Sequence, residues 1–337
     1  MVMGAGASAD FGVPTLRSVF KETHARQYLR QDEWLRTNLE ETFWEPRGHT
    51  LETSDDSLTI EEMLTILRDW RLEESIPHRL TVEDQGKFCR SLYVLIERAL
   101  FEGKSTKMEY LNPLLEFARS RFAHITWASF NWDCVFESSF WYSSGPPEPY
   151  ARCNPSVAIP LADWHPGTND HLFLKLHGGI NWWMIDGRLT YVRFAGSGDL
   201  AKRWTDYANG KTPEVYPVIL EPSYYKYEGE QYKILEPQWA AFLKALIEAD
   251  CVLILGYSLP EGDVQARSKI LTAFQANERS EWAVVDPSPT TCSRYRRLLG
   301  NRRMKTFEQG LAGFNNQLEA SLLEAFACVR GGAEHAC

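Results

Sequence analysis

The second half of the chain alternates short apolar runs with helical segments, and this alternation limits the fold more than any other feature. The run at 251–255 reads Cys-Val-Leu-Ile-Leu, with no polar residue inside it. Strands of this kind are typical of parallel sheets that are covered on both faces. We therefore predict an α/β fold with a Rossmann-like, mostly parallel open sheet and helices on both faces. The predicted strands are 124–130, 172–176, 215–220, 251–255 and 282–285, and the predicted helices beside them are 238–249, 264–276, 290–299 and 312–326.

The first part of the chain has a helical pattern instead. Apolar residues recur at every third or fourth position in 60–67 and 88–96, which indicates amphipathic helices. Thr59 or Ser57 is placed to cap the first of them. We predict that residues 18–120 form a helical insertion after a glycine-rich N-terminal stretch. A β-hairpin is predicted over 180–192, because Asp186-Gly187 suits a two-residue turn.

Charge and cysteine content exclude several classes of protein. The chain of 337 residues has a formal net charge of −9, whereas a dedicated nucleic-acid-binding protein normally presents a basic face, so we expect no direct binding of nucleic acid. It has neither an apolar run near the ~20 residues that span a bilayer nor a secretory signal pattern, so we expect a cytoplasmic protein without a membrane anchor. The seven cysteines include no Cys-x-x-Cys pair, and we expect free thiols and no zinc site.

Small residues are concentrated at the start of the chain. The stretch Gly4-Ala5-Gly6-Ala7-Ser8 is followed by Gly12 and Pro14. Small residues let a backbone approach a pyrophosphate, and the N-terminus of a following helix offers N–H groups to an anion. Taken by itself, the stretch is equally compatible with a loose tail, because a lone glycine-rich segment is a weak signal.

Polar residues follow the predicted strands, where ligands of an open parallel sheet bind. Asn131 and Asp133 follow the first strand and suit a ribose diol or a water, although, taken alone, such a pair more often forms an Asx turn that ends a strand. His177 follows the second strand and suits a general base, although a lone histidine is more often structural. Glycine and serine in Gly256-Tyr257-Ser258 suit a phosphate or ribose, and Asp286, after the next strand, suits the hydroxyls of an adenosine ribose.

This ordered set resembles the sirtuin family, and more closely its bacterial sirtuin-like branch of NAD-consuming, antiphage-defence proteins. Gly4 to Ser8 with Gly12-Val13-Pro14 is similar to the family's GAGxS…GxP loop, and Asn131-Trp132-Asp133 to its N-x-D. His177-Gly178 matches the His-Gly of the family, and Gly256-Tyr257-Ser258 its nucleotide loop. The segment from Gly256 to Asp263 is typical of the bacterial branch.

Two departures from the deacylating sirtuins affect the expected reaction. The four-cysteine zinc module of those enzymes has no counterpart, and the aromatic residue that shields the reacting ribose is replaced by Leu16, while Arg17 is kept. Loss of the shield favours attack by water over transfer to an acyl-lysine. The resemblance therefore implies an NAD glycohydrolase that uses NAD as its substrate, with Asn131, His177 and Asp133 as catalytic residues. It implies NAD binding by Gly4, Ala5, Gly6, Ala7, Ser8, Gly12, Pro14, Thr15, Arg17, Asn131, Asp133, Gly256, Tyr257, Ser258 and Asp286.

Two other functions stay open at this point: an NAD-dependent protein deacylase and a non-catalytic sensor that binds NAD or ADP-ribose. We expect a single sirtuin-like catalytic domain over 1–326 and a frayed tail over 327–337. Family analogy implies an antiphage-defence effector that is controlled as a homo-oligomer or by a partner protein encoded nearby. Because a parallel strand usually has five or six residues, the short run Met1-Val2-Met3 suggests that the native start lies upstream of Met1.

Overall fold

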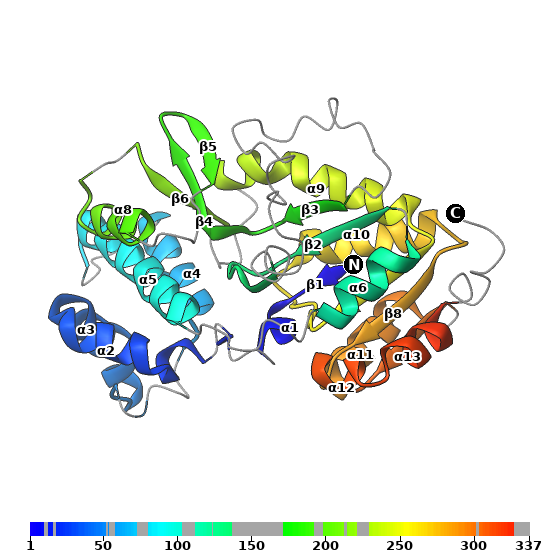
Figure 1. The fold of residues 1–337 in the computed structure, drawn as a ribbon. Helices are drawn as coiled ribbons and strands as arrows, with labels where there is room; N and C mark the ends of the chain where they lie inside the picture. Colours follow the sequence, from blue (N-terminus) through cyan, green and yellow to red (C-terminus); the bar gives the residue numbers. More distant parts are fainter. Residues whose placement is uncertain are drawn as a thin grey trace. The chain divides into compact units, whose positions relative to one another are not determined.

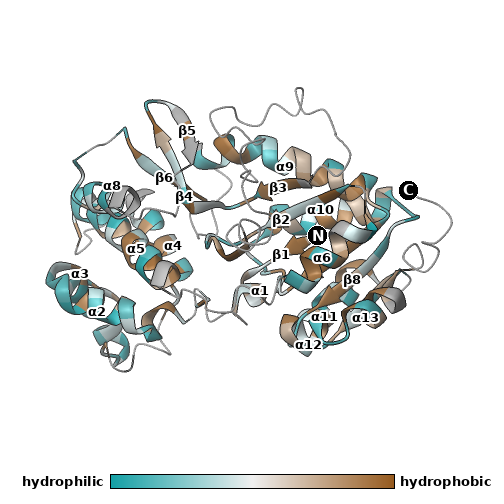
Figure 2. Ribbon diagram, viewed as in Figure 1, coloured by the Kyte–Doolittle hydropathy of each residue, from teal (hydrophilic) through white to brown (hydrophobic). Residues whose placement is uncertain are grey.

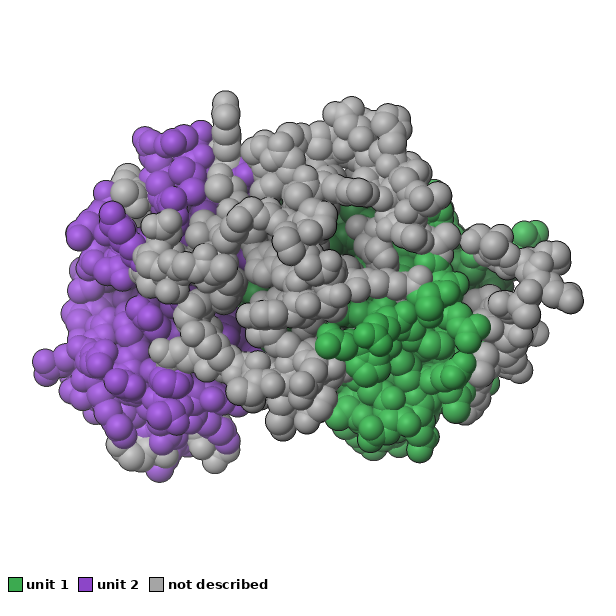
Figure 3. All heavy atoms as spheres, in the orientation of Figure 1, with its two compact units in different colours: residues 1–12, 105–179, 233–337 green, residues 13–104, 180–232 purple. Residues whose placement is uncertain are grey.

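The computed structural model describes residues 1–9, 13–15, 18–51, 53, 58–72, 80–102, 112–122, 124–136, 171–191, 198–211, 214–220, 229–300 and 303–326. The chain forms two compact units, coloured separately in Figure 3. Unit 1 comprises 1–12, 105–179 and 233–337, and unit 2 comprises 13–104 and 180–232.

A six-stranded sheet forms the centre of unit 1, and every neighbouring pair of its strands is parallel. The strands lie in the order β3-β2-β1-β7-β8-β9, and β3, β2 and β1 can be followed side by side in Figure 1. Counted along the chain, this is the Rossmann order 3-2-1-4-5-6, in which the direction of winding reverses between the first and fourth strands. That reversal falls between β1 and β7. The strands are β1 (Val2–Met3), β2 (Ile125–Ser129), β3 (His171–Lys175), β7 (Cys251–Leu255), β8 (Glu281–Val285) and β9 (Met304–Phe307).

The helices of unit 1 cover both faces of this sheet, because its strands are apolar on both sides. Four of the five residues of β7 and of β8 are buried, and Figure 2 shows hydrophobic colour at β1 and β3. The α10 helix packs against α11, and α6 packs against α13. The predicted Rossmann-like α/β fold is therefore confirmed. The helices of this unit are α1 (Ala5–Ala9), α6 (Asn112–Arg121), most of α9 (Glu230–Glu248), α10 (Val264–Ala276), α11 (Pro289–Leu299), α12 (Leu311–Asn315) and α13 (Leu318–Ala325).

The β1 strand is short but central. Val2 is paired with Ala128 on one side and Ile254 on the other. The ammonium nitrogen of Met1 donates a hydrogen bond of 2.5 Å to the carbonyl of Thr126. Two ladders thus hold β1 in place.

Unit 2 combines helices from two segments of the chain with a small sheet of order β5-β4-β6. The α2 helix packs on α5, which also packs on α8. Thr59 caps α4 through a capping box: its backbone N–H donates to Glu62 (2.8 Å), and its Oγ accepts from the Glu62 N–H (3.2 Å). The elements are η1 (Val19–Lys21), α2 (Thr23–Gln31), α3 (Glu33–Leu39), η2 (Glu40–Trp44), η3 (Glu45–Arg47), α4 (Ile60–Leu72), α5 (Val82–Glu102), most of β4 (Gly178–Ile185), β5 (Arg188–Tyr191), α8 (Gly198–Ala208) and β6 (Tyr216–Ile219).

The predicted strands and helices are present, with differences at several points. The strand predicted over 215–220 is β6, which lies in the three-stranded sheet of unit 2 and not in the parallel sheet. Asp186 and Gly187 have φ values of 50° and 71°, as the predicted hairpin requires. The helix predicted from 238 begins at Glu230 and continues through Pro237. The helix predicted over 312–326 is divided into α12 and α13, and two elements were not predicted, β9 and α8. The expectation of free thiols is wrong at Cys251, which is disulfide-bonded, whereas Cys89, Cys134 and Cys292 are free and buried.

Candidate functional site

The glycine-rich stretch lies where the sheet reverses its winding, between the ends of β1 and β7. The N–H of Gly4 donates to Leu255 O at 3.0 Å, and the N–H of Gly6 donates to Gly256 O at 2.9 Å. A Cβ added to Gly4 would stand 2.5 Å from Tyr257 Cα, and one added to Gly256, whose φ is +56°, would stand 2.1 Å from Ala7 N. The two loops therefore interlock backbone to backbone, at a distance that no side chain permits.

Because of this packing, several backbone N–H groups of the glycine-rich stretch are bonded within the protein. The N–H groups of Gly4, Gly6 and Ala7 all donate to carbonyl groups of the protein, the last to Gly4 O at 2.9 Å. The first two bonds hold the two loops together, and the third closes a turn within the glycine-rich stretch. The contact with a pyrophosphate stays a prediction. It would have to be made by the other residues of the stretch, of which Ala5 is exposed.

Asn131 connects the end of β2 with the glycine-rich stretch. It is nine-tenths buried, and its Nδ2 donates to Gly4 O at 3.0 Å and to Ser8 Oγ at 2.8 Å. Its backbone N–H donates to Ser129 Oγ at 3.1 Å. Within the described residues, its amide oxygen Oδ1 has no partner. The side chain is thus fixed by its nitrogen and presents a hydrogen-bond acceptor.

Asp133 follows two residues later and is also buried. Its Oδ1 accepts the N–H of Val135 at 3.0 Å, so the Asx turn that competes with a ligand-binding role is present. Its backbone carbonyl accepts a hydrogen bond from Nζ of Lys175, a lysine with no exposed surface at the end of β3. The N–H of Lys175 donates to Gln238 Oε1 at 2.6 Å, which connects the strand to α9.

His177 follows β3 and is 8% exposed. Its Nε2 lies 3.5 Å from Asp263 Oδ1, a contact between an imidazole and a carboxylate that is too long and poorly aligned for a hydrogen bond. The other carboxylate oxygen of Asp263 accepts a hydrogen bond of 2.6 Å from Tyr257 Oη. Gly178, with φ of 69°, turns the chain directly after the histidine.

Aromatic rings surround the histidine. Phe130 stacks on Tyr257 with ring centroids 4.0 Å apart and planes 3° apart, and it meets the His177 ring edge to face at 5.1 Å. Trp239 from α9 lies 6.0 Å from the same ring. The imidazole is therefore enclosed by apolar surface on these sides and faces a carboxylate on another.

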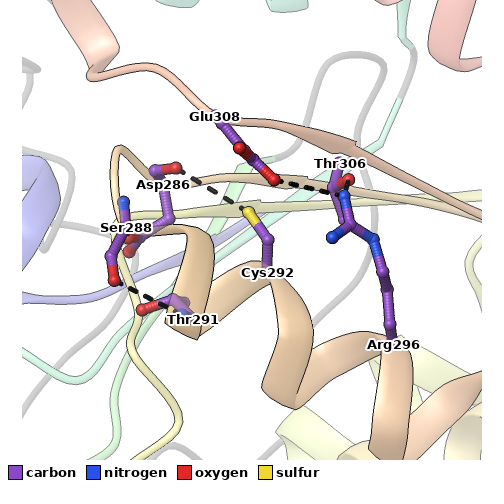
Figure 4. Close-up of polar contacts among 7 residues, drawn as sticks. All are labelled: Asp286, Ser288, Thr291, Cys292, Arg296, Thr306 and Glu308. Carbon is purple, nitrogen blue, oxygen red and sulfur yellow. Dashed lines mark hydrogen bonds and ion pairs between the residues drawn. The ribbon is translucent and has the colours of Figure 1, made fainter.

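Asp286 follows β8, and its surroundings are drawn in Figure 4. Its Oδ1 accepts the N–H of Ser288 at 2.9 Å, and Ser288 Oγ accepts the N–H of Thr291 at 3.4 Å at the start of α11. Its carbonyl faces the Cys292 thiol at 3.8 Å. Burial raises the pKa of the Asp286 carboxyl above its ordinary value, while the bonds to Ser288 and Thr291 and the charge of Arg294 act in the opposite direction.

Only some of the predicted site residues are in contact with one another in the described structure. The described contacts bring together Gly4, Ser8, Asn131, Gly256 and Tyr257, and backbone bonds join this group to β8. Ser258 is exposed, and its carbonyl accepts from Arg294 at 3.1 Å. Gly12 and Arg17 lie outside the described residues, and Pro14 and Thr15 belong to unit 2.

Two residues of the site were missed by sequence reasoning. Lys175 carried a signal, because a lysine beside an apolar strand core is unusual. Asp263 carried a weaker one: it immediately precedes a predicted helix, where an aspartate is ordinarily read as a cap.

A family model described as a SIR2-like domain matches residues 126–307, more than half of the chain. The chain belongs to the SIR2-like family. Membership supports a sirtuin-type, NAD-dependent function. The match includes Asn131, Asp133, His177, Gly256 and Asp286, and it ends at the last strand of the sheet.

Searches among known proteins add little to this family assignment. No curated protein matches the chain. One solved structure that it resembles is described as Sir2 in complex with the inhibitor EX-527, 2′-O-acetyl-ADP-ribose and a deacetylated p53 peptide. The likeness covers 95% of this chain and 91% of that one, at 10% identity and a TM-score of 0.43, too low to support an argument. Among the described residues, no helix has the length and apolar character needed to cross a membrane, and no group of three His, Cys, Asp or Glu side chains is arranged to hold a metal ion.

Proposed function

We propose that this protein is an NAD glycohydrolase, which cleaves NAD with water to nicotinamide, ADP-ribose and a proton. One observation carries the proposal: Asn131 is fixed by its amide nitrogen at the point where the sheet reverses its winding and retains an acceptor oxygen. Ligands of an open α/β sheet bind at that place.

The reaction needs positioning and one proton acceptor. The bond between the nicotinamide nitrogen and C1′ of the ribose breaks, its electron pair stays with the nitrogen, and water forms the new bond to C1′. Asn131 Oδ1 accepts a hydrogen bond from a ribose hydroxyl or from the attacking water, and Asp133 orients the same sugar. His177 takes the proton that the water loses and releases it to solvent. The Asp286 carboxylate binds the adenosine ribose.

The test is the release of nicotinamide from NAD by the purified chain. We expect His177→Ala and Asn131→Ala each to abolish it. Asn131→Ala also removes two hydrogen bonds and costs about 1–3 kcal/mol of stability, so rates are compared well below the melting temperature. His124→Ala is the matched control, because it removes an exposed histidine just before β2. Normal turnover by folded His177→Ala or Asn131→Ala would refute the assignment.

The same assay separates the two other functions. Faster turnover with an acylated peptide, and none with NAD alone, would indicate a deacylase. Tight binding of NAD or ADP-ribose without release of nicotinamide would indicate a sensor. The glycohydrolase predicts release from NAD alone, at a rate that the peptide does not change.

The proposal includes control of the activity, because unregulated hydrolysis of NAD in a cytoplasm is toxic. By family analogy, the enzyme is an effector of bacterial antiphage defence, and it is held inactive as a homo-oligomer or by a partner protein encoded nearby. Nicotinamide release is therefore measured for the chain alone, for each oligomer separated by size, and with the products of neighbouring genes. Equal activity in all three preparations would argue against such control.

A further inference from the structure

We propose that Asp263 is a positioning residue for His177, which orients the imidazole and stabilises its protonated form. The catalytic part of this inference rests on the proposed function, since it takes His177 as the proton acceptor. The structural part stands on the contacts of Asp263 with Tyr257 and His177, and all three residues belong to unit 1.

The carboxylate of Asp263 is 2% exposed and faces two different groups. Its Oδ2 accepts a hydrogen bond of 2.6 Å from Tyr257 Oη, and its Oδ1 lies 3.5 Å from His177 Nε2. A buried carboxylate is stable only when hydrogen bonds or an opposite charge compensate it. Tyr257 supplies the first throughout, and His177 supplies the second once it has accepted a proton.

The position of Asp263 at the start of α10 makes this orientation informative. An aspartate at the N-cap ordinarily accepts an N–H of the first helical turn, which is worth about 1 kcal/mol. Here the side chain makes no such bond, although the residue is the N-cap. Its carboxylate is instead directed to Tyr257 and His177. The chain forgoes a local cap in favour of a contact with a residue 86 positions away.

Tyr257 is held so that its hydroxyl keeps this place. Its ring is stacked on Phe130, and its carbonyl accepts a hydrogen bond of 3.0 Å from Tyr295 Oη. Burial, with the charges of Asp286 and Asp263, raises the pKa of Tyr295 well above its ordinary value, so that this hydroxyl stays a donor. The described groups around the His177 ring include Asp263 from α10, Phe130 after β2 and Trp239 from α9. Of these three, Asp263 alone is ionisable.

The structural part is tested without any assay of activity. The imidazole signals of ¹⁵N-labelled histidine are followed by NMR against pH, and the His177 signal is identified with His177→Gln. We expect Asp263→Asn to lower the titration midpoint of His177 by about one pH unit or more, because an opposite charge nearby is worth that much. The control is Glu261→Gln, which removes an exposed carboxylate from the same loop and should leave the midpoint unchanged.

A second variant keeps the test decisive if Asp263→Asn fails to fold. Tyr257→Phe retains the ring that stacks on Phe130 and removes only the hydroxyl that holds Asp263. This variant should change the pH at the midpoint of the His177 titration without unfolding the chain. An unchanged midpoint in a folded Asp263→Asn, or in Tyr257→Phe if the former is unfolded, overturns the proposal.

Kinetics test the catalytic part. For the NAD reaction we expect Asp263→Asn to lower kcat about 10- to 100-fold, as groups that orient a reacting side chain commonly do. KM for NAD should change little, because Asp263 acts through His177. A rise in KM with kcat unchanged would instead make Asp263 a substrate-binding residue and overturn the positioning role. If the unaltered chain releases no nicotinamide, the proposed function fails, while the NMR titration still decides whether Asp263 positions His177.

Discussion

Replacement of Gly256 by alanine tests whether the two loops at the centre of the sheet depend on their glycines. Gly256 has a φ of +56°, and a Cβ at this position would stand 2.1 Å from Ala7 N and 2.4 Å from Gly6 C. Both neighbours are backbone atoms, which no change of rotamer can move. The loop after β1 must therefore retreat by about 1.3 Å to reach an ordinary contact of 3.4 Å.

The cost follows from the bonds that such a retreat strains. The left-handed conformation costs an alanine about 1–2 kcal/mol. The hydrogen bonds from Gly6 to Gly256 and from Gly4 to Leu255 are lost or lengthened, at about 1 kcal/mol each. We expect Gly256→Ala to lower the free energy of unfolding by about 3–4 kcal/mol. Gly48→Ala is the control, because Gly48 has a φ of +75° and a Cβ added there would meet no atom of the described residues within 4 Å, its chain neighbours aside. It should cost only about 1–2 kcal/mol.

Urea unfolding followed by tryptophan fluorescence measures both variants, and calorimetric titration measures their affinity for NAD. Gly256→Ala should lose stability and bind NAD more weakly, while Gly48→Ala should bind it normally. If Gly256→Ala is no less stable than Gly48→Ala, the loops are not interlocked in the way that the distances indicate, and the reasoning from them is wrong.

Three other substitutions give independent tests. Lys175→Met removes the donor to the Asp133 carbonyl, and we expect nicotinamide release to fall about 10-fold with KM little changed, since the loop that carries Asn131 is less restrained. Asp286→Asn keeps an acceptor for the N–H of Ser288. Because burial raises the pKa of Asp286 above its ordinary value of 3.8, the wild type should lose stability relative to this variant as the pH rises from about 3.8 through the raised pKa. Urea midpoints at several pH values measure this difference. Asn181→Leu replaces a fully buried amide whose nitrogen and oxygen both lack a hydrogen-bond partner among the described residues. We expect the free energy of unfolding in urea to rise by about 1–3 kcal/mol, and a less stable variant would contradict this.

The sequence predicted β2, β3, β7 and β8 because these strands are mostly buried and each is followed within two residues by a polar residue or a glycine. The elements that it missed lack this signal. The β9 strand, Met-Lys-Thr-Phe, lies at the edge of the sheet and is mostly not buried, so its residues alternate weakly. The start of α9 was missed because Pro237 breaks the helical pattern, although the helix continues through it.

The site was predictable only as far as strand ends could reveal it. Asn131, His177 and Gly256 were predicted as site residues because ligands bind where parallel strands end, and these roles stay predictions. The partners of these residues depend on contacts between distant segments, which periodicity does not report. No role was predicted for Lys175, and Asp263 was noted only as the end of a segment typical of the bacterial branch. The fold brings Lys175 to Asp133 and Asp263 to His177. The glycines were read as a site for a ligand, whereas their close approach to each other is what the structure adds.

The interlocked loops also link the two halves of the proposed reaction. Gly4 accepts from Asn131 through its carbonyl, and Gly256 precedes Tyr257, which binds Asp263 beside His177. The group that positions the sugar and the group that accepts the proton are therefore fixed to the same pair of backbone segments. A displacement of about 1 Å between these segments changes the position of both groups at once, and such a displacement is enough to slow an enzyme about 100-fold. For this reason, the loss of activity in Gly256→Ala should exceed what its weaker binding of NAD explains, and kcat should fall together with affinity.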